Sequence, residues 1–511
     1  MTFRSIPLIA AARRLALGGC WPLVILWPVL GHRPLAASDA EITHDLVILG
    51  GRVIDPASGL DETLHLGIDD GRVTAMTESP LRGRTSIDAR GLIVAPGFID
   101  LHQHAWDDRT ERLKARDGVT SMLELEVGTA DVDGWYRQRE GVSRLHHGVS
   151  AGHIPLRMQV MGDPPAFLPP SHSNASLLPA SERQLAELAR RLTEELDAGA
   201  VAVGFGLAYT PAATDAEIVR MFGVAARHHA SCHIHLRRRG DAAPLDADET
   251  AQLAARAGAS LHLVHVQATA SGDVVLDLLR IVAARRAAGE DVTAEVYPWT
   301  AGMTEIRSAI FGEGWQQRLG VTYGDLQWGG TDERLTEESF RRYREQGGLV
   351  IVHRNTAAAV EAAVKHPLTM IASDGLAGHP RNAGTYARVL GHYARERGLL
   401  SWAEAIDKIS RMPAERLATR VPAMRNKGRI GIGSDADLTL FDPRTVAAAA
   451  TYEKPERPSL GIRHVLVAGT PVVRDGKLAE DAFPGQPIRV PRRNAADSFP
   501  ADAGEHPRGS P

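Results

Sequence analysis

The middle of the chain alternates short apolar runs with longer amphipathic stretches, and this alternation restricts the fold more than any other feature. About eight strand-then-helix units can be counted, which predicts an α/β fold, a (β/α)8 barrel over residues 96–424. Helices are expected at 181–198, 214–229, 246–257, 273–288 and 402–411. The strand candidates are GLIVAPGFIDLH (91–102), GVTSMLELEV (118–127), PLRMQVM (155–161), AVAVGFGL (200–207), SCHIHLR (231–237), SLHLVHVQ (260–267), DVTAEVYP (291–298), LVIVH (349–353) and TMIASDG (369–375).

Both ends of this segment are flanked by a different pattern, in which apolar runs are cut by Gly, Asp and Pro turns. That pattern predicts short antiparallel strands. A chain of 511 residues exceeds one average domain, so a second domain is expected beside the barrel. We expect this domain to be one small β-sandwich built from 44–95 and 425–492. Residues 303–345 fit the barrel pattern poorly and are expected to form an insertion over its mouth. The tail, 493–511, is expected to be disordered.

The first 38 residues have the composition of a signal peptide. Arg4, Arg13 and Arg14 precede the apolar run LALGGCWPLVILWPVLG, and the small residues of LAASDA follow. This predicts export to the periplasm or beyond, with a weak twin-arginine character; an uncleaved membrane anchor is the alternative. Cleavage would leave Cys232 without Cys20, so no internal disulfide is expected. A net charge of −4 does not favour a nucleic-acid partner.

Polar side chains collect where the predicted strands end. In barrel enzymes this is the face that carries the chemistry. Two histidines at i and i+2 share one face of a strand, so His102 and His104 can bind one ion. Imidazole and carboxylate groups are ligands for Zn²⁺ and similar metals. The strand-end candidates are His102, His104, Glu124, Glu126, His233, His235, His265 and Asp374.

Several motifs resemble those of the amidohydrolase superfamily, and most closely its D-aminoacylase branch. They are PGFIDLHQH (96–104), HLR (235–237), VHVQ (264–267), EVYPWTAG (295–302), SDGLAGHPRNAGTYARVLGHYARE (373–396) and GRIGIGSDADLTLFDP (428–443). The resemblance implies a barrel with a small β-sandwich and one or two Zn²⁺ ions per chain. It also implies site roles: His102, His104 and Asp374 at one metal position, His235 and His265 at the other, and Tyr297 and Arg381 on the substrate.

The chain departs from that branch at two positions. The branch has a metal-binding Cys in GNCG where this chain reads LEVG (125–128). A carboxylated lysine cannot replace it, because no Lys lies between Lys114 and Lys365. A carboxylate is then expected, with Glu126 favoured over Glu124; two structural, salt-bridged glutamates are the alternative. Gln267 stands where the family has a substrate-binding Lys and is expected to bind substrate at the same place, although a neutral amide cannot form that ion pair.

These observations predict an enzyme that hydrolyses a C–N amide bond, most closely an N-acyl-D-amino-acid deacylase. A metal-bound hydroxide would attack the amide and Asp374 would act as the acid and base. Hydrolysis of a cyclic amide, as by a hydantoinase or dihydroorotase, or of a lactone or carbamate, is an alternative on the same site. A non-catalytic periplasmic binding protein is an alternative of another class.

The remaining histidines are weaker signals. His146, His147, His228 and His229 are expected on helix surfaces. His353 is expected either to line the pocket or to cap a strand.

Overall fold

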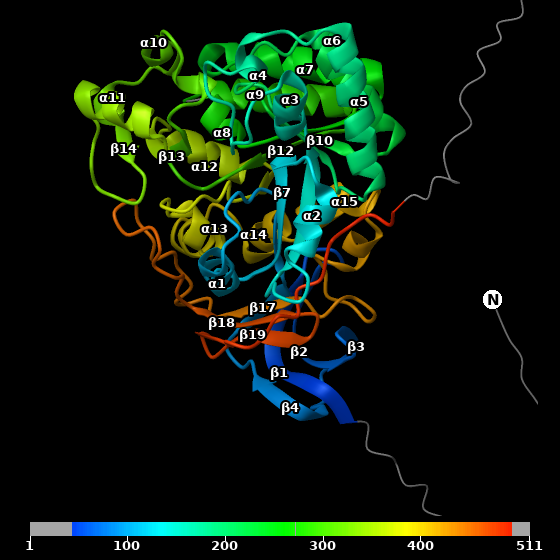
Figure 1. The fold of residues 1–511 in the computed structure, drawn as a ribbon. Helices are drawn as coiled ribbons and strands as arrows, with labels where there is room; N and C mark the ends of the chain where they lie inside the picture. Colours follow the sequence, from blue (N-terminus) through cyan, green and yellow to red (C-terminus); the bar gives the residue numbers. More distant parts are fainter. Residues whose placement is uncertain (1–42, 271, 493–511) are drawn as a thin grey trace, which may run out of the picture. The chain divides into compact units, whose positions relative to one another are not determined.

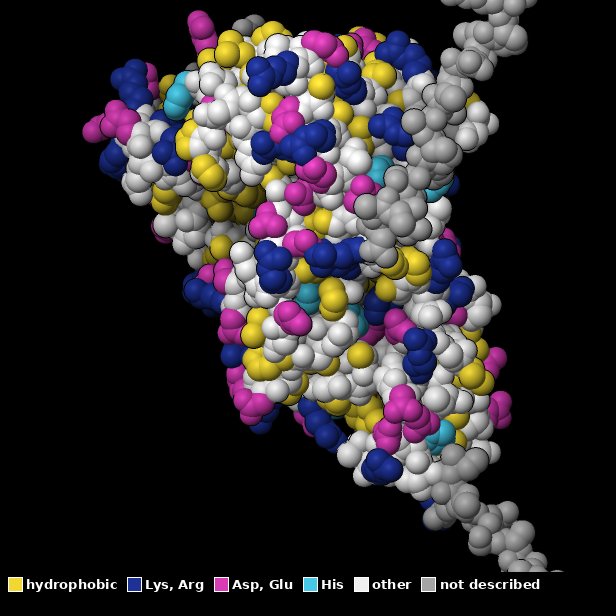
Figure 2. All heavy atoms as spheres, turned by 45° about the vertical axis from the view of Figure 1, so that its right-hand side comes forward, with side chains coloured by type: hydrophobic (Ala, Val, Ile, Leu, Met, Phe, Trp, Pro, Cys, Tyr) yellow, Lys and Arg dark blue, Asp and Glu magenta, His cyan; other side chains and the backbone are white. Residues whose placement is uncertain are grey.

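The computed structural model describes residues 43–270 and 272–492. The predicted signal peptide and the predicted disordered tail lie outside these residues. Within them, no helix combines the length and the apolar character needed to cross a bilayer. Basic and acidic side chains lie interspersed over the face drawn in Figure 2.

A parallel eight-stranded barrel forms the centre of the described chain, as predicted (Figure 1). Its outer strands β6 and β16 are joined beyond their ends, where Gln103 and Gly375 form a bridge. The strands, in spatial order, are β16 (Thr369–Ile371), β12 (Val292–Val296), β11 (Ser260–Leu263), β10 (Ser231–His235), β9 (Val203–Gly206), β8 (His146–Gly152), β7 (Val119–Thr129) and β6 (Phe98–Asp100).

Helices surround the barrel, and α5 shows how the sequence specifies them. Its first turn is closed by a capping box between Ser181 and Gln184. Leu185, Leu188, Leu192 and Leu196 recur every three or four residues and are all buried, which turns one face of α5 to the core. The helices are α1 (Asp108–Arg116), α2 (Val132–Arg137), α3 (His153–Met161), α4 (Asn174–Leu177), α5 (Glu182–Asp197), α6 (Asp215–Arg227), α7 (Ala243–Ala257), α8 (Val266–Thr269), α9 (Val274–Ala287), α12 (Ala357–Lys365), α13 (Arg381–Arg388), α14 (Trp402–Ile409) and α15 (Arg411–Ala418).

One strand prediction was wrong, and one predicted strand lies outside the barrel. The run 155–161 lies in helix α3, and the barrel strand is the preceding β8, whose Gly- and Ser-rich sequence carries little strand signal. His146 and His147 are therefore buried in a strand instead of exposed on a helix. The run 349–353 is a strand, β15, but it pairs with β13 and β14 in a separate sheet.

The other pair of histidines ends a helix. His228 is the C-cap of α6 and is buried, contrary to prediction, while His229 follows it and is exposed. The helix expected over 402–411 is α14, which ends at Ile409, and a second helix, α15, begins at Arg411 after Ser410.

Both chain ends contribute to one nine-stranded sheet, in which β5 pairs with β17 antiparallel. Strands from the two ends also share one apolar core, where Leu66 and Leu438 are fully buried. The strands are β1 (Thr43–Asp55), β2 (Leu60–Asp69), β3 (Arg72–Thr77), β4 (Arg82–Asp88), β5 (Ile93–Pro96), β17 (Leu438–Phe441), β18 (Ile462–Val467), β19 (Thr470–Arg474) and β20 (Lys477–Leu478).

The segment that interrupts the barrel pattern folds on its own small sheet. It comprises β13 (Ala301–Glu305), β14 (Leu326–Trp328) and β15 (Leu349–His353), with α10 (Trp315–Leu319) and α11 (Glu337–Gln346). Phe311, Trp315 and Phe340 pack against one another in its core. Met303, Thr304 and Ile310 line a cavity together with barrel residues, so the segment forms part of a pocket wall.

Candidate metal centre and its pocket

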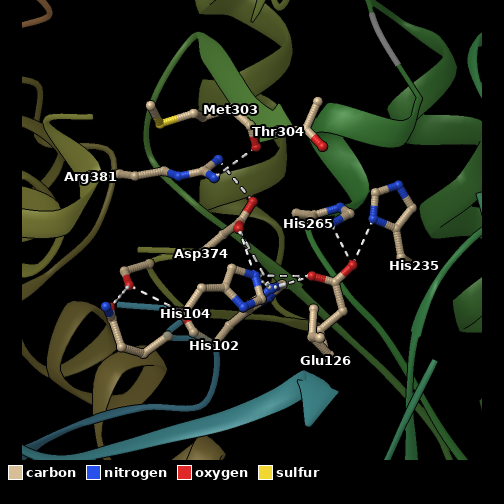
Figure 3. Close-up of polar contacts among 12 residues, drawn as sticks. His102, His104, Glu126, His235, His265, Met303, Thr304, Asp374 and Arg381 are labelled. Carbon is tan, nitrogen blue, oxygen red and sulfur yellow. Dashed lines mark hydrogen bonds and ion pairs between the residues drawn. The ribbon is translucent and has the colours of Figure 1, made fainter. Parts of the chain in front are cut away.

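Six side chains with metal-binding atoms meet at the carboxyl ends of the barrel strands (Figure 3). Because parallel strands end on one face of a barrel, side chains far apart in sequence come together there. Glu126 lies on β7 and His235 ends β10. The other four follow β6, β11 and β16: His102, His104, His265 and Asp374.

The first cluster brings four acceptor atoms within a few ångströms of one another. The Nε2 atoms of His102 and His104 lie 3.0 Å apart. Glu126 Oε2 lies 2.7 Å from the first of these nitrogens and 3.2 Å from the second. Asp374 Oδ1 lies 3.6 and 3.3 Å from the same two nitrogens. The four groups therefore surround a single point.

Glu126 connects this cluster to a second one. Its other oxygen, Oε1, lies 2.7 Å from His235 Nδ1 and 3.7 Å from His265 Nε2. One carboxylate thus faces two candidate metal positions, one through each oxygen. This is the place expected for the group that replaces the missing Cys.

Glu124 has a different position. Its Oε2 lies 2.6 Å from His104 Nδ1, and its Oε1 accepts a hydrogen bond of 3.0 Å from the Val127 backbone. Glu124 thus contacts the ring nitrogen of His104 that faces away from the first cluster. Hydrogen bonding to the far ring nitrogen fixes the tautomer and orientation of a metal-binding histidine.

Glu295 orients the ring of His102 in the same way, and the sequence analysis did not predict this residue. Its Oε1 lies 2.5 Å from His102 Nδ1, and its Oε2 lies 3.0 Å from His262 Nε2. The available signal was a carboxylate inside the apolar strand β12, two residues before Tyr297. An acid buried in a strand is costly unless it has such a partner.

These contacts favour positive charge between the rings. Since the Nδ1 atoms of His102 and His104 face carboxylates, their Nε2 lone pairs point at each other and at Glu126. Burial lowers the pKa of His102, but the surrounding carboxylates, first Glu295 and then Asp374, raise it to about 10. Protonated imidazole or a bound cation can supply this charge, and the imidazole and carboxylate donors of the cluster fit a divalent metal ion.

The second position differs in one respect. Arg239 Nη2 lies 2.5 Å from His235 Nε2. A guanidinium is only a donor, so this contact makes Nε2 the acceptor and leaves the ring proton on Nδ1. A metal ligated through Nδ1 requires that proton to leave and the Arg239 contact to change. The first cluster has no such obstacle among the described residues.

Two site residues have unusual backbone conformations. His265 and Asp374 both have positive φ, 35° and 51° respectively. Such values cost a non-glycine residue on the order of 1–3 kcal/mol, and they concentrate at functional sites. The turns aim both side chains into the barrel mouth.

A buried network holds the seam of the barrel beside the site. Lys114 Nζ lies 2.7 Å from Asp100 Oδ2 and 2.6 Å from Ser373 Oγ. Asp100 Oδ1 accepts from the backbone N–H of His102 at 3.2 Å and of Ser373 at 3.0 Å. Asp100 therefore ties the chain next to His102 to the chain next to Asp374.

A close backbone approach positions Glu126. Gly204 on β9 packs so tightly on β7 that a Cβ there would lie 2.2 Å from the Glu126 carbonyl oxygen. Glycine is the residue that allows this approach.

The three residues predicted to hold substrate lie in different places. Tyr297 lines the pocket, and its hydroxyl has no hydrogen-bond partner among the described residues. Arg381 is buried behind Asp374, with Nη1 2.8 Å from Oδ2, and Gln267 donates to the Tyr297 carbonyl at 3.0 Å. Of the three, only Tyr297 is among the described residues that line the pocket, so direct substrate contact by the other two stays a prediction.

The remaining histidines lie apart from the pocket. His233 is buried below the site and packs on His262 with ring centroids 4.5 Å apart. His353 contacts Gln327 at 2.8 Å, and its neighbours Val352 and Arg354 line the pocket instead.

Comparison with known proteins shows the family to which these motifs belong. Residues 93–472 match the amidohydrolase family. The chain is 30% identical to the N-acyl-D-glutamate deacylase of Alcaligenes xylosoxydans xylosoxydans, covering 88% of this chain and 97% of that relative. It is 29% identical to the D-aminoacylase of the same organism, covering 90% and 100%.

A solved structure has a similar fold. The crystal structure of N-acyl-D-glutamate deacylase from Bordetella bronchiseptica was determined with zinc and a phosphonate inhibitor that mimics the tetrahedral reaction intermediate. It matches this chain with a TM-score of 0.75 and 26% identity, over 88% of this chain and 100% of that one.

Proposed function

The chain belongs to the amidohydrolase family, and on that premise we propose that it deacylates an N-acyl-D-amino acid or a related N-acyl compound. The observation that carries the proposal is Glu126, which faces His102 and His104 with one oxygen and His235 with the other. These contacts support the proposal that Glu126 replaces the missing Cys as a metal ligand. The deacylase relatives support the amide bond and the D configuration.

His102, His104, Glu126 and Asp374 would hold a divalent ion, which would supply Lewis acidity to polarise an amide carbonyl and to make water more acidic. Zinc is the proposed ion, because four imidazoles and two carboxylates are donors that zinc accepts. The zinc complex of the Bordetella bronchiseptica relative supports this choice.

Asp374 is the proposed acid and base. Burial alone would raise the pKa of its carboxyl, but Arg381 and then His102 hold it well below its usual range. The carboxylate is therefore ionised at neutral pH and able to accept the proton of an attacking water. Returning that proton to the amide nitrogen lets the amine leave.

Tyr297 is the proposed hydrogen-bond donor to the substrate. Burial raises the pKa of its phenol above its ordinary value, so the hydroxyl keeps its proton. The ring is held by Arg381, whose guanidinium carbon lies 4.8 Å from the ring centroid. A fixed donor without a protein partner is suited to a substrate oxygen.

The leader sequence supports the proposal that this hydrolysis takes place after export. Its basic start, apolar centre and small-residue end match a signal peptide.

Incubating the purified protein with a substrate panel tests the function. N-acetyl-D-amino acids, their L enantiomers, a hydantoin and a lactone are compared by release of free amine or acid. We expect turnover of the D series. Turnover confined to the cyclic compounds would replace this proposal with the alternative activity, and no turnover with metal bound would favour a binding protein.

The Asp374→Asn variant tests the proton transfer. We expect kcat to fall by about 10²–10⁴, the usual contribution of a positioned acid or base. The other ligands of the first cluster remain, so metal content, measured by elemental analysis, should stay close to that of the wild type. A variant that keeps a tenth or more of the wild-type kcat refutes this role.

A further inference from the structure

Four arginines around the pocket form no ion pair with a carboxylate among the described residues. Arg239 and Arg354 line the pocket that contains the metal centre. Arg318 and Arg344 line an adjoining cavity, which Arg239 lines as well. We call this second cavity the arginine chamber.

The contacts of the first two arginines are to neutral groups. Arg239 Nη1 and Arg354 Nη1 both approach the Ala268 carbonyl oxygen, at 3.4 and 3.3 Å. Arg239 also contacts His235, as described above. Two guanidinium groups thus converge on one neutral acceptor, and neither is in an ion pair with a carboxylate of residues 43–270 or 272–492.

The two arginines of the insertion are held in the same way. Arg318 donates to the carbonyls of Gly312 at 3.3 Å and Ile310 at 3.4 Å. Arg344 donates to the Phe311 carbonyl at 2.6 Å and to Ser171 Oγ at 2.8 Å. Carbonyl oxygens orient a guanidinium but leave its charge uncompensated.

Arg238, a neighbouring arginine, differs from these four because it forms ion pairs. Arg238 also lines the chamber, but it lies 2.9 Å from Asp246 and contacts Glu249. Its charge is neutralised by the protein, so it is not one of the four. Glu313 is an acidic residue on the chamber wall, and no ion pair joins it to Arg318.

Arg239, Arg344 and Arg354 are partly removed from water, whereas Arg318 is exposed. Burial first, and then Arg239, lower the pKa of Arg354 to about 10. Like charges brought together in a partly buried wall repel one another, and an anion between them removes this repulsion. A carboxylate matches the planar fork of a guanidinium.

The sizes of the two cavities show where such an anion has room. The pocket at the metal centre has a volume of about 50 Å³, whereas the arginine chamber has about 700 Å³. Sites for small molecules usually range from about 300 to 1,000 Å³. Arg239, Ile310 and Leu319 line both cavities. A substrate whose scissile amide lay in the small pocket would have room for its remaining part in the adjoining chamber.

We propose that Arg239, Arg318, Arg344 and Arg354 bind a further carboxylate of the substrate, away from the scissile amide, so that the enzyme selects acidic N-acyl amino acids. This inference rests on the proposed function and extends it to a substrate class. The carboxylate lies either on the amino-acid side chain or on the acyl group, and both sources present the same chemistry to the arginines.

Paired substrates that differ only in charge test the proposal. N-acetyl-D-glutamate against N-acetyl-D-glutamine places the charge on the amine side. N-succinyl-D-alanine against N-butyryl-D-alanine places it on the acyl side. We expect kcat/KM to favour the acidic member of at least one pair by about tenfold or more, as for a hydrogen bond to a charged group.

Arg318→Gln and Arg354→Gln should each reduce this preference by about tenfold, mainly through the KM of the acidic substrate. Arg341→Gln is the matched control, because Arg341 lies on α11 of the same insertion, is exposed and pairs with Glu337. It should leave the preference unchanged. Equal kcat/KM within both pairs, or a preference that survives both variants, overturns the inference while leaving the deacylase function intact.

A binding measurement separates the two proposals. Calorimetry with metal-depleted protein compares glutarate, a dicarboxylate, with butyrate. Tighter binding of glutarate that weakens in Arg318→Gln supports the carboxylate site even if no N-acyl amino acid is hydrolysed, a result that would overturn the proposed function alone. Equal, weak binding of both acids counts against the arginine site.

Discussion

Glu126 and Glu124 lie two residues apart on β7, and replacing each by glutamine distinguishes a bridging ligand from an orienting group. Glu126 Oε2 lies 2.7 Å from His102 Nε2 and 3.2 Å from His104 Nε2. Its Oε1 lies 2.7 Å from His235 Nδ1 on the other side. An amide retains one acceptor oxygen, and its nitrogen is a donor that cannot bind a metal ion. Glu126→Gln therefore removes the carboxylate donor from at least one of the two positions.

The expected magnitudes differ between the two variants. Glu124 contacts a single histidine nitrogen, His104 Nδ1 at 2.6 Å, and lies behind the ring. Loss of such a partner usually reduces metal affinity by about 10–100-fold, or about 1.4–2.8 kcal/mol. Glu124→Gln should therefore bind the wild-type number of ions when metal is in excess. Glu126→Gln should bind at least one ion fewer per chain under the same conditions.

Elemental analysis after dialysis against excess zinc gives the stoichiometry, and titration against a chromogenic chelator gives the affinity. Circular dichroism of both variants serves as the folding control. If Glu126→Gln binds as many ions as the wild type, with an affinity no weaker than that of Glu124→Gln, the bridging role is refuted and Glu126 is a structural acid.

Three further predictions follow from other contacts. Tyr297→Phe removes a hydroxyl that has no hydrogen-bond partner in the described part of the chain, so kcat/KM should fall about tenfold or more while urea unfolding is unchanged; an unchanged kcat/KM contradicts its role as donor. Lys114→Met breaks a fully buried pair with Asp100 and should reduce the free energy of unfolding by about 3–5 kcal/mol; a loss below about 1 kcal/mol in urea titration contradicts this. Although burial opposes it, His146 and then Lys427 hold the pKa of Asp437 below its ordinary 3.8. Its stabilising effect is therefore present above that pH and lost as the pH falls below it, so Asp437→Asn should be less sensitive to acid in unfolding measurements from about pH 5 to 2; equal acid sensitivity of both proteins counts against the argument.

The barrel was predictable because its signal is local. Apolar runs followed by amphipathic stretches specify strand and helix, as in β7 and α5, and the ends of parallel strands must share a face. The spacing of His102 and His104 placed both rings on one side of the chain for the same reason.

Features that depend on packing between distant parts of the chain could not be predicted from the sequence. Strand β8 has little strand propensity and exists because neighbouring strands pair with it on both sides. Arg239 and Arg354 lie 115 positions apart in the numbering, and only the folded chain brings both to the Ala268 carbonyl.

The sequence by itself determined which donors were available: with no Lys between Lys114 and Lys365, a carboxylate was the donor expected to replace the missing Cys. It did not determine which carboxylate. Glu124 and Glu126 point to the same face of β7, about 7 Å apart along the strand, and differ only in what lies opposite each of them. Glu126 meets His235 of β10 across the barrel, while Glu124 lies beside the far edge of His104. That difference is set by how the strands are staggered around the barrel, and only the tertiary structure decides it.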